Sequence, residues 1–153
     1  MQFTLFTDYS LRSLVFIALK SENSDTLVTI RDISSELNIS NNHIVKVIHN
    51  LSKHGFIETT RGNHGGVRLS RSPSEINLGE VISVTENFSC MLHCEHNDCC
   101  FHAVCLFQGI MHRAAQAMLK EISEHTLADL LKDRERLSQA LETSPASPTV
   151  SVS

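Results

Sequence analysis

Two short helix patterns joined by a three-residue turn, within residues 29 to 54, constrain the fold of this chain more than any other feature. The first pattern opens with Thr29 as a helix cap and carries Asp32 in the capping-box position. The second opens after Ser40 as a cap and is followed by Gly55, a residue that commonly ends helices. Two short helices connected by so tight a turn predict a helix-turn-helix.

A β-hairpin is predicted directly after these helices. Residues 56–60 and 67–70 are rich in β-branched and apolar side chains, and the segment between them contains three glycines. A hairpin at this place forms the wing of a winged helix-turn-helix. The glycine-rich segment lacks the Gly-Lys-Ser/Thr ending of a phosphate-binding loop, so a wing turn is the better interpretation.

Apolar periodicity predicts four further helices, at about residues 7–20, 78–87, 104–123 and 126–141. The helix over residues 104–123 carries an apolar stripe outside the predicted winged-helix core. Such a stripe needs a partner, most simply the same helix of a second subunit, so a homodimer is predicted. The fold class is therefore mainly α with a small β-hairpin wing: a winged helix-turn-helix domain followed by a long C-terminal dimerisation helix.

This pattern divides the chain into three parts. We expect a winged helix-turn-helix domain over residues 1–80, a cysteine-bearing loop with the dimerisation helix over residues 81–141, and a tail over residues 142–153. The tail is rich in Ser, Thr and Pro, and we expect it to be disordered. The N-terminus lacks the pattern of a signal peptide, and no stretch approaches the roughly 18 apolar residues of a membrane span, which favours a cytoplasmic location.

The charge pattern favours DNA as the partner of the winged helix. The chain has a formal net charge of −4, but residues 38–71 contain five basic side chains and one acidic side chain. In a helix-turn-helix the first residues of the second helix contact base edges in the major groove, and here these are Asn41, Asn42 and His43. An asparagine can bond adenine through two hydrogen bonds.

Phosphate contacts are predicted for four basic residues of the second helix and the wing. Lys46 and Lys53 belong to the helix, and Arg61 and Arg68 to the wing. Such contacts supply salt-dependent affinity with little sequence information. The alternative is a helical hairpin used for protein contacts with a solvated basic face, and the wing together with the uneven charge disfavours it.

All five cysteines of the chain lie within residues 90–105, among three histidines and two carboxylates. In a chain without a secretion signal, clustered thiols are more often metal ligands or redox groups than disulfides. Two sets of three ligands are possible, Cys94 and Cys105 with either Cys99 or Cys100, and Cys90 is left over in both. A catalytic role is disfavoured because no acid–base constellation accompanies the thiols, so the chain is not expected to be an enzyme.

The spacing of these cysteines leaves the bound group open. Zinc is commonly held by three cysteines and a histidine, but the segment lacks the second pair of ligands typical of structural zinc sites. Iron–sulfur clusters tolerate irregular spacing and unusual fourth ligands. The residues alone therefore support zinc and an iron–sulfur cluster about equally.

Four stretches together carry a resemblance to a known family. They are Phe-Thr-Asp-Tyr-Ser-Leu-Arg at residues 6–12, Asn-His-Ile-Val-Lys at 42–46, the wing at 61–69, and the three-cysteine segment whose last member, Cys105, opens a long helix. Over roughly residues 1–133 the chain resembles the iron–sulfur winged-helix transcriptional regulators. Within them it resembles the nitric-oxide-sensing NsrR branch more than the IscR branch, because Gln108 stands where the latter has a histidine.

The resemblance implies a homodimeric repressor that binds palindromic double-stranded DNA and senses nitric oxide. It implies an iron–sulfur cluster, 4Fe–4S rather than 2Fe–2S, held by Cys94, Cys99 and Cys105 with Asp8 from the partner subunit. Cys100 is the alternative to Cys99. The remaining alternatives are a zinc-stabilised or thiol-sensing winged-helix regulator, an IscR-like regulator of cluster homeostasis, and a cluster-binding oxidoreductase with a vestigial helix-turn-helix.

Overall fold

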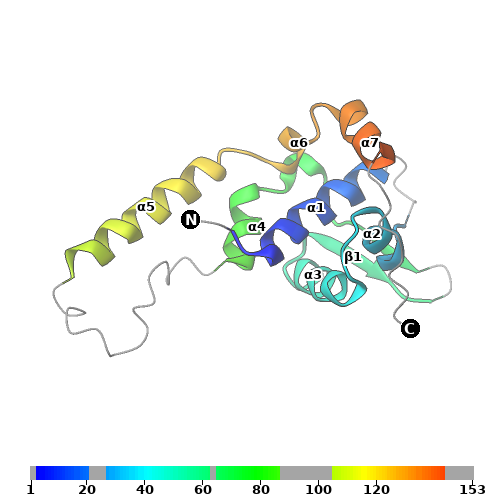
Figure 1. The fold of residues 1–153 in the computed structure, drawn as a ribbon, viewed down its shortest axis with the longest axis horizontal. Helices are drawn as coiled ribbons and strands as arrows, with labels where there is room; N and C mark the ends of the chain where they lie inside the picture. The colour runs from blue at the N-terminus through cyan, green and yellow to red at the C-terminus, as the bar shows by residue number, and fades with distance from the viewer. Residues whose placement is uncertain (1–2, 21–26, 63–64, 87–104, 144–153) are drawn as a thin grey trace.

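The computed structural model describes residues 3–20, 27–62, 65–86 and 105–143. The helices and strands along the chain are α1 (Leu5–Lys20), α2 (Ile30–Glu36), α3 (Asn41–Lys53), β1 (Ile57–Thr60), β2 (Gly66–Leu69), the 3₁₀ helix η1 (Pro73–Glu75), α4 (Leu78–Thr85), α5 (Leu106–Ile122), α6 (Leu127–Leu130) and α7 (Arg134–Thr143). The predicted class, mainly helical with one small hairpin, is confirmed (Figure 1).

The helix-turn-helix forms through the local signals that predicted it. The Thr29 side chain accepts a hydrogen bond from the backbone N–H of Asp32, whose carboxylate accepts from the backbone N–H of Thr29, so the capping box is complete. Asn38 adopts a φ of 52° in the turn, a conformation that asparagine tolerates better than most residues. Ser40 caps α3, and Gly55, at a φ of 73°, follows its end.

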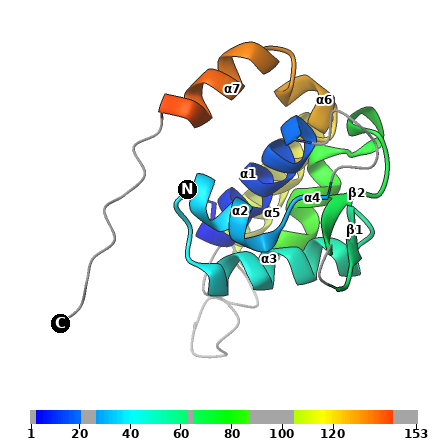
Figure 2. The same ribbon diagram turned by 90° about the vertical axis from the view of Figure 1, so that its right-hand side faces the viewer.

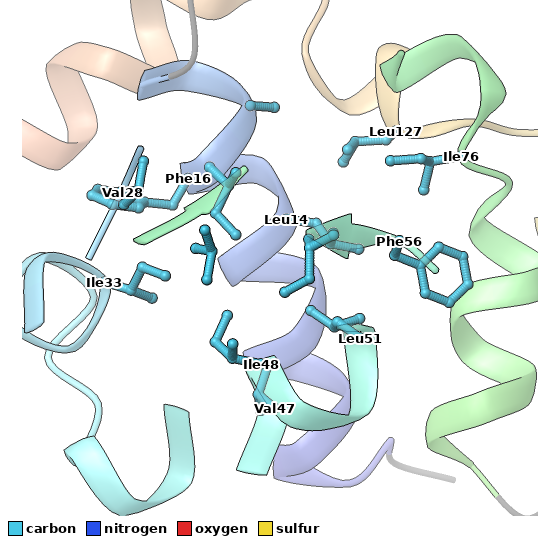
Figure 3. Close-up of a cluster of buried hydrophobic side chains, with 14 of the residues drawn as sticks. Leu14, Phe16, Val28, Ile33, Val47, Ile48, Leu51, Phe56, Ile76 and Leu127 are labelled. Atoms are coloured by element: carbon cyan, nitrogen blue, oxygen red, sulfur yellow. The ribbon is translucent and has the colours of Figure 1, made fainter. Parts of the chain in front are cut away.

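The hydrophobic core lies around α1, which runs through the middle of the molecule (Figures 1 and 3). Leu14, Phe16 and Ile17 of α1 are fully buried or nearly so, and they meet apolar side chains from α2, α3, the hairpin, α4 and α6. Each such side chain contributes about 1.5–3 kcal/mol of transfer free energy when buried. Because α1 packs directly against α3, the position of one helix constrains the other.

The wing is a two-stranded antiparallel hairpin in which Ile57 pairs with Leu69 and Glu58 with Arg68. Ile57 and Val67 point into the core, whereas Glu58 and Arg68 face solvent. A backbone bridge between Val28 and Val67 ties the hairpin to the segment before α2. Residues 63–64, at the predicted turn of the wing, lie outside the described residues.

Two predicted helices differ from the observed ones. The first helix begins at Leu5 rather than at Thr7 or Asp8. The single helix predicted over residues 126–141 is divided into α6 and α7, because the carboxylate of Asp133 accepts a hydrogen bond from the backbone N–H of Arg136 and so starts a new helix. The helical region continues to Thr143, and the rest of the predicted tail lies outside the described residues.

Helix α5 extends away from the rest of the subunit, and only its C-terminal part approaches the core (Figures 1 and 2). Its one buried residue is Ala115. Leu106, Phe107 and Ile110 are 84%, 54% and 50% exposed, an unusual condition for three large apolar side chains so close together. No helix in the described part of the chain is both long enough and apolar enough to cross a bilayer.

Candidate DNA interface and metal-ligand positions

The N-terminus of α3 presents a polar surface to solvent. Ile44, Val47, Ile48 and Leu51 anchor the opposite face of the helix in the core. Asn41, Asn42 and His43 are all exposed. The side chain of His43 contacts the Ser40 hydroxyl at 2.9 Å, which orients the imidazole at the start of the helix. The three residues predicted to contact base edges therefore lie together at one exposed helix end, as a major-groove reader requires.

The basic residues predicted to contact phosphates are also exposed, but they are not equivalent. Lys46 and Lys53 project from α3, and Arg61 follows β1. Arg68 instead pairs with Glu58 on the neighbouring strand, at 2.9 Å between Nη2 and Oε2. A solvent-exposed ion pair of this kind is worth no more than about 1 kcal/mol, so a DNA phosphate can displace the carboxylate.

Replacing Lys46 by alanine is expected to weaken DNA binding by a similar factor on all sequences. Lys46 is exposed one helical turn beyond Asn42, where a helix in the major groove passes the phosphates. Loss of one phosphate contact should lower the slope of log affinity against log salt by about 0.9. Fluorescence anisotropy over a salt series measures this slope.

Lys132→Ala is the matched control for Lys46→Ala. Lys132 lies between α6 and α7 in the chain, and it pairs with Asp129. These two helices lie on the far side of α1 from α3 (Figures 1 and 2). The control variant should keep the parent slope. An unchanged slope in Lys46→Ala would remove this residue from the interface.

Asp8, the predicted oxygen ligand, lies in the first half of α1 and is 39% exposed. Its carboxylate binds Arg12 through two contacts, with Arg12 Nη2 at 2.8 Å from Oδ2 and Arg12 Nε donating to Oδ1 at 2.9 Å. Residues at this i, i+4 spacing are neighbours on a helix surface, which brings the two side chains together. Because the pair is exposed, its carboxylate remains available for exchange with another cationic partner.

Cys105 is the only predicted sulfur ligand among the described residues, since Cys94, Cys99 and Cys100 fall within residues 87–104. It occupies the N-cap position of α5 and makes no capping hydrogen bond through its side chain. It is partly exposed and forms no disulfide with the described residues. A helix N-terminus favours a negatively charged group, so a metal-bound thiolate suits this position.

The described residues of one subunit do not by themselves assemble a metal site. Within residues 3–20, 27–62, 65–86 and 105–143 there is no group of three or more His, Cys, Asp or Glu side chains suited to one ion. The start of α5, where Cys105 lies, is far from the start of α1 in Figure 1. A metal site that used both Cys105 and Asp8 would therefore take its ligands from two subunits.

Two contacts near these positions have no signal in the sequence. Glu86, at the end of α4, accepts hydrogen bonds from the first turn of α1, and Tyr9 of α1 packs against His43 of α3. Each joins residues more than 30 positions apart. Only a proposed topology that placed α1 between α3 and α4 could have suggested them.

Comparison with known proteins gives consistent results. The model of the Rrf2 family, described as iron-dependent transcriptional regulators, matches residues 3–133. The HTH-type transcriptional regulator NsrR of Halalkalibacterium halodurans is 40% identical over 148 residues, covering 95% of this chain and 100% of that protein. The NsrR of Bacillus subtilis is 38% identical over 145 residues, covering 93% of this chain and 98% of that protein.

Solved structures support the same fold. IscR of T. potens has a TM-score of 0.68 at 23% identity, covering 90% of each chain. CymR of B. subtilis, the global cysteine regulator, has a TM-score of 0.63 at 23% identity, covering 85% of this chain and 95% of that one. At this level of identity the similarity establishes the winged-helix architecture, and the function has to come from the sequence relatives.

Proposed function

The chain belongs to the Rrf2 family of transcriptional regulators, and from this premise we propose that it is a homodimeric DNA-binding repressor that senses nitric oxide through an iron–sulfur cluster. The observation that carries the proposal is the 40% identity, over 95% of the chain, to a regulator named NsrR. This function needs a recognition helix and a set of cluster ligands. The exposed polar end of α3 supplies the first, and the cysteine-rich segment supplies the second.

In the proposed complex, α3 enters the major groove. Asn41, Asn42 and His43 contact base edges, and Lys46, Lys53, Arg61 and Arg68 contact phosphates. The exposed apolar side chains at the start of α5 pack against the same helix of a second subunit, which relates two copies of α3 by a two-fold axis. A palindromic operator with half-sites about one helical turn apart fits this symmetry.

The proposed ligands are Cys94, Cys99 and Cys105, with the partner subunit's Asp8 completing the set. Cys100 remains the alternative to Cys99. This donor set fits an iron–sulfur cluster, because thiolates are its usual ligands and an irregular fourth ligand is tolerated. The family resemblance favours the 4Fe–4S form over 2Fe–2S, and Cys105 and Asp8 are both partly exposed, as ligands of a group shared between subunits would have to be.

The proposed switch depends on the weakest ligand. A bound cluster supplies iron atoms with which nitric oxide reacts. Asp8 would be the weakest of the proposed ligands, because iron in such a cluster prefers thiolate to carboxylate. An Asp8 carboxylate that is not bound to iron would be held by Arg12 of its own helix, in the bidentate pair seen here. Without Asp8 as a ligand, the cysteine segment of one subunit would not be linked to α1 of the other, and the spacing of the two recognition helices would not be fixed.

Anaerobic purification followed by DNA binding tests the proposal. The expected protein is brown, absorbs broadly in the visible range and contains iron at least equal to zinc. It should bind a palindromic promoter fragment in a salt-dependent way and release it after stoichiometric nitric oxide. A colourless, zinc-rich protein would favour the zinc-stabilised regulator instead. An intact cluster without any DNA binding would favour the oxidoreductase.

A further inference from the structure

The start of helix α1 is capped by two residues: Thr4, which directly precedes the helix, and Glu86, which follows α4. Thr4 precedes the first helical residue, and its hydroxyl accepts a hydrogen bond from the backbone N–H of Thr7 at 3.4 Å. In a capping box the third helical residue would be Glu or Gln and would bind the backbone N–H of the cap. Here that residue is Thr7, and Glu86 takes over the acceptor role from the end of α4.

Three hydrogen bonds converge on one carboxylate oxygen of Glu86. The backbone N–H of Thr4 donates to Oε1 at 2.6 Å, the Thr4 hydroxyl at 2.9 Å and the Thr7 hydroxyl at 2.6 Å. The Thr7 side chain is completely buried, and its hydroxyl also lies 2.9 Å from Thr85 Oγ1, so its hydrogen-bond acceptors come from the end of α4 rather than from water. A negative charge at a helix N-terminus is further stabilised by the helix dipole. Glu86 therefore fixes the start of α1 with more than a single weak contact.

Glu86 also stands between α4 and the cysteine-rich segment in the sequence. Glu86 is the C-cap residue of α4, and its backbone N–H donates to the carbonyl of Ile82. The next cysteine along the sequence is Cys90, four residues later, followed by the proposed ligands. Glu86 therefore joins the end of α4 to the start of α1, and in the sequence it stands directly before the residues that lead to the cysteines.

The other end of the connection is an aromatic contact between α1 and the recognition helix. The rings of Tyr9 and His43 lie 5.6 Å apart between centroids, with an angle of 46° between their planes. Tyr9 follows Asp8 directly and lies little more than one helical turn from Thr4. The same His43 ring contacts Ser40, the cap of α3. A displacement of the first two turns of α1 would thus be transmitted to an exposed residue at the DNA-reading end of α3.

We propose that Glu86 and Tyr9 are positioning residues that couple the cysteine-bearing part of the chain to the recognition helix within one subunit. Glu86 holds the first turn of α1, and Tyr9 transmits the position of that turn to His43. The inference rests on the proposed cluster function but adds a connection that is separate from the link made by Asp8 between subunits. It predicts that neither residue is a ligand and that both control the response.

Nuclear magnetic resonance of the cluster-free protein tests the connection without any metal. Glu86→Ala should shift the backbone amide resonance of His43, although the two residues belong to different helices. The same change made in a Tyr9→Leu background should shift it much less, because the ring that transmits the displacement is gone. Glu80→Ala is the matched control, since it removes a carboxylate from the same helix, and that carboxylate pairs with Arg71 rather than with α1.

DNA binding with and without the cluster provides the second readout. For each variant the ratio of operator affinity in the cluster-loaded and cluster-free forms is measured. Glu86→Ala and Tyr9→Leu should each lower this ratio at least about fivefold, the lower end of typical allosteric coupling. The affinity ratio of the double variant should be no lower than that of the more affected single variant, because both residues belong to the same coupling pathway. Tyr9→Phe keeps the ring and should keep the parent ratio.

The outcomes separate this inference from the proposed function. If the parent protein binds DNA equally with and without the cluster, the proposed function fails and the coupling has no role. If the parent responds but Glu86→Ala and Tyr9→Leu keep its ratio, only the coupling is wrong. Circular dichroism establishes that each variant is folded, and Glu86→Gln, which keeps an acceptor oxygen but not the charge, replaces Glu86→Ala if that variant unfolds.

Discussion

Replacing Cys105 by alanine is expected to reduce bound iron to near background while leaving the winged-helix core folded. The thiol is one of three proposed sulfur ligands, and two thiolates with an exchangeable carboxylate cannot hold a cluster firmly. The fold should hardly change, because Cys105 is partly exposed and its side chain makes no capping hydrogen bond. Iron and sulfide analysis after anaerobic reconstitution, together with circular dichroism, measures both effects.

Substitution of the other cysteines supplies the controls for this result. Cys90→Ala should keep the parent iron content, since that thiol is outside both possible ligand sets. Cys99→Ala and Cys100→Ala decide the middle ligand: the one that loses iron is the ligand. Retention of the parent iron content and visible spectrum by Cys105→Ala would show that the ligand set has been assigned wrongly.

The double substitution Phe107→Glu and Ile110→Glu is expected to convert the protein to a folded monomer. Both side chains are at least half exposed on α5 and lie on the stripe proposed to meet a second subunit. Two buried carboxylates on each side of such an interface would be strongly unfavourable. Sedimentation analysis should report the mass of one chain. Affinity for a palindromic operator should fall about 10²–10⁴-fold, because the second half-site no longer adds to the binding of the first.

A change on the opposite face of the same helix tests whether the effect belongs to the stripe. Gln116 is exposed and lies nine residues, or half a turn beyond two full turns, from Phe107. Gln116→Glu adds a negative charge to α5 without touching the proposed interface, so it should remain dimeric. A double variant that stayed dimeric and kept its operator affinity would place the subunit interface elsewhere.

The parts of the fold that could be predicted from the sequence are those set by neighbouring residues. Thr29, Asp32, Ser40 and Gly55 act within one or two helical turns of their own positions, and each does what its pattern indicated. The break between α6 and α7 was missed because apolar periodicity continues across it. A single carboxylate, Asp133, competes there with continuation of the helix.

The start of α1 and the candidate site could not be predicted in the same way. Glu86 caps a residue 82 positions away, so no window of sequence contains both partners. The polar end of α3 was predictable because helix amphipathicity fixes which residues face the core. The proposed oxygen ligand came from family resemblance, since spacing within one chain carries no information about a residue that acts across a subunit boundary.

The ion pair between Glu58 and Arg68 has a consequence for how such a protein would search for its operator. A lone arginine attracts any phosphate from about a Debye length away, whereas a paired arginine is nearly neutral beyond its immediate surroundings. In the absence of DNA, the Glu58 carboxylate thus occupies the position on Arg68 that a phosphate would take. Arg68 would then add little to adhesion on random DNA, and it would engage only where α3 already fits the groove closely enough to bring a phosphate within contact distance of the pair.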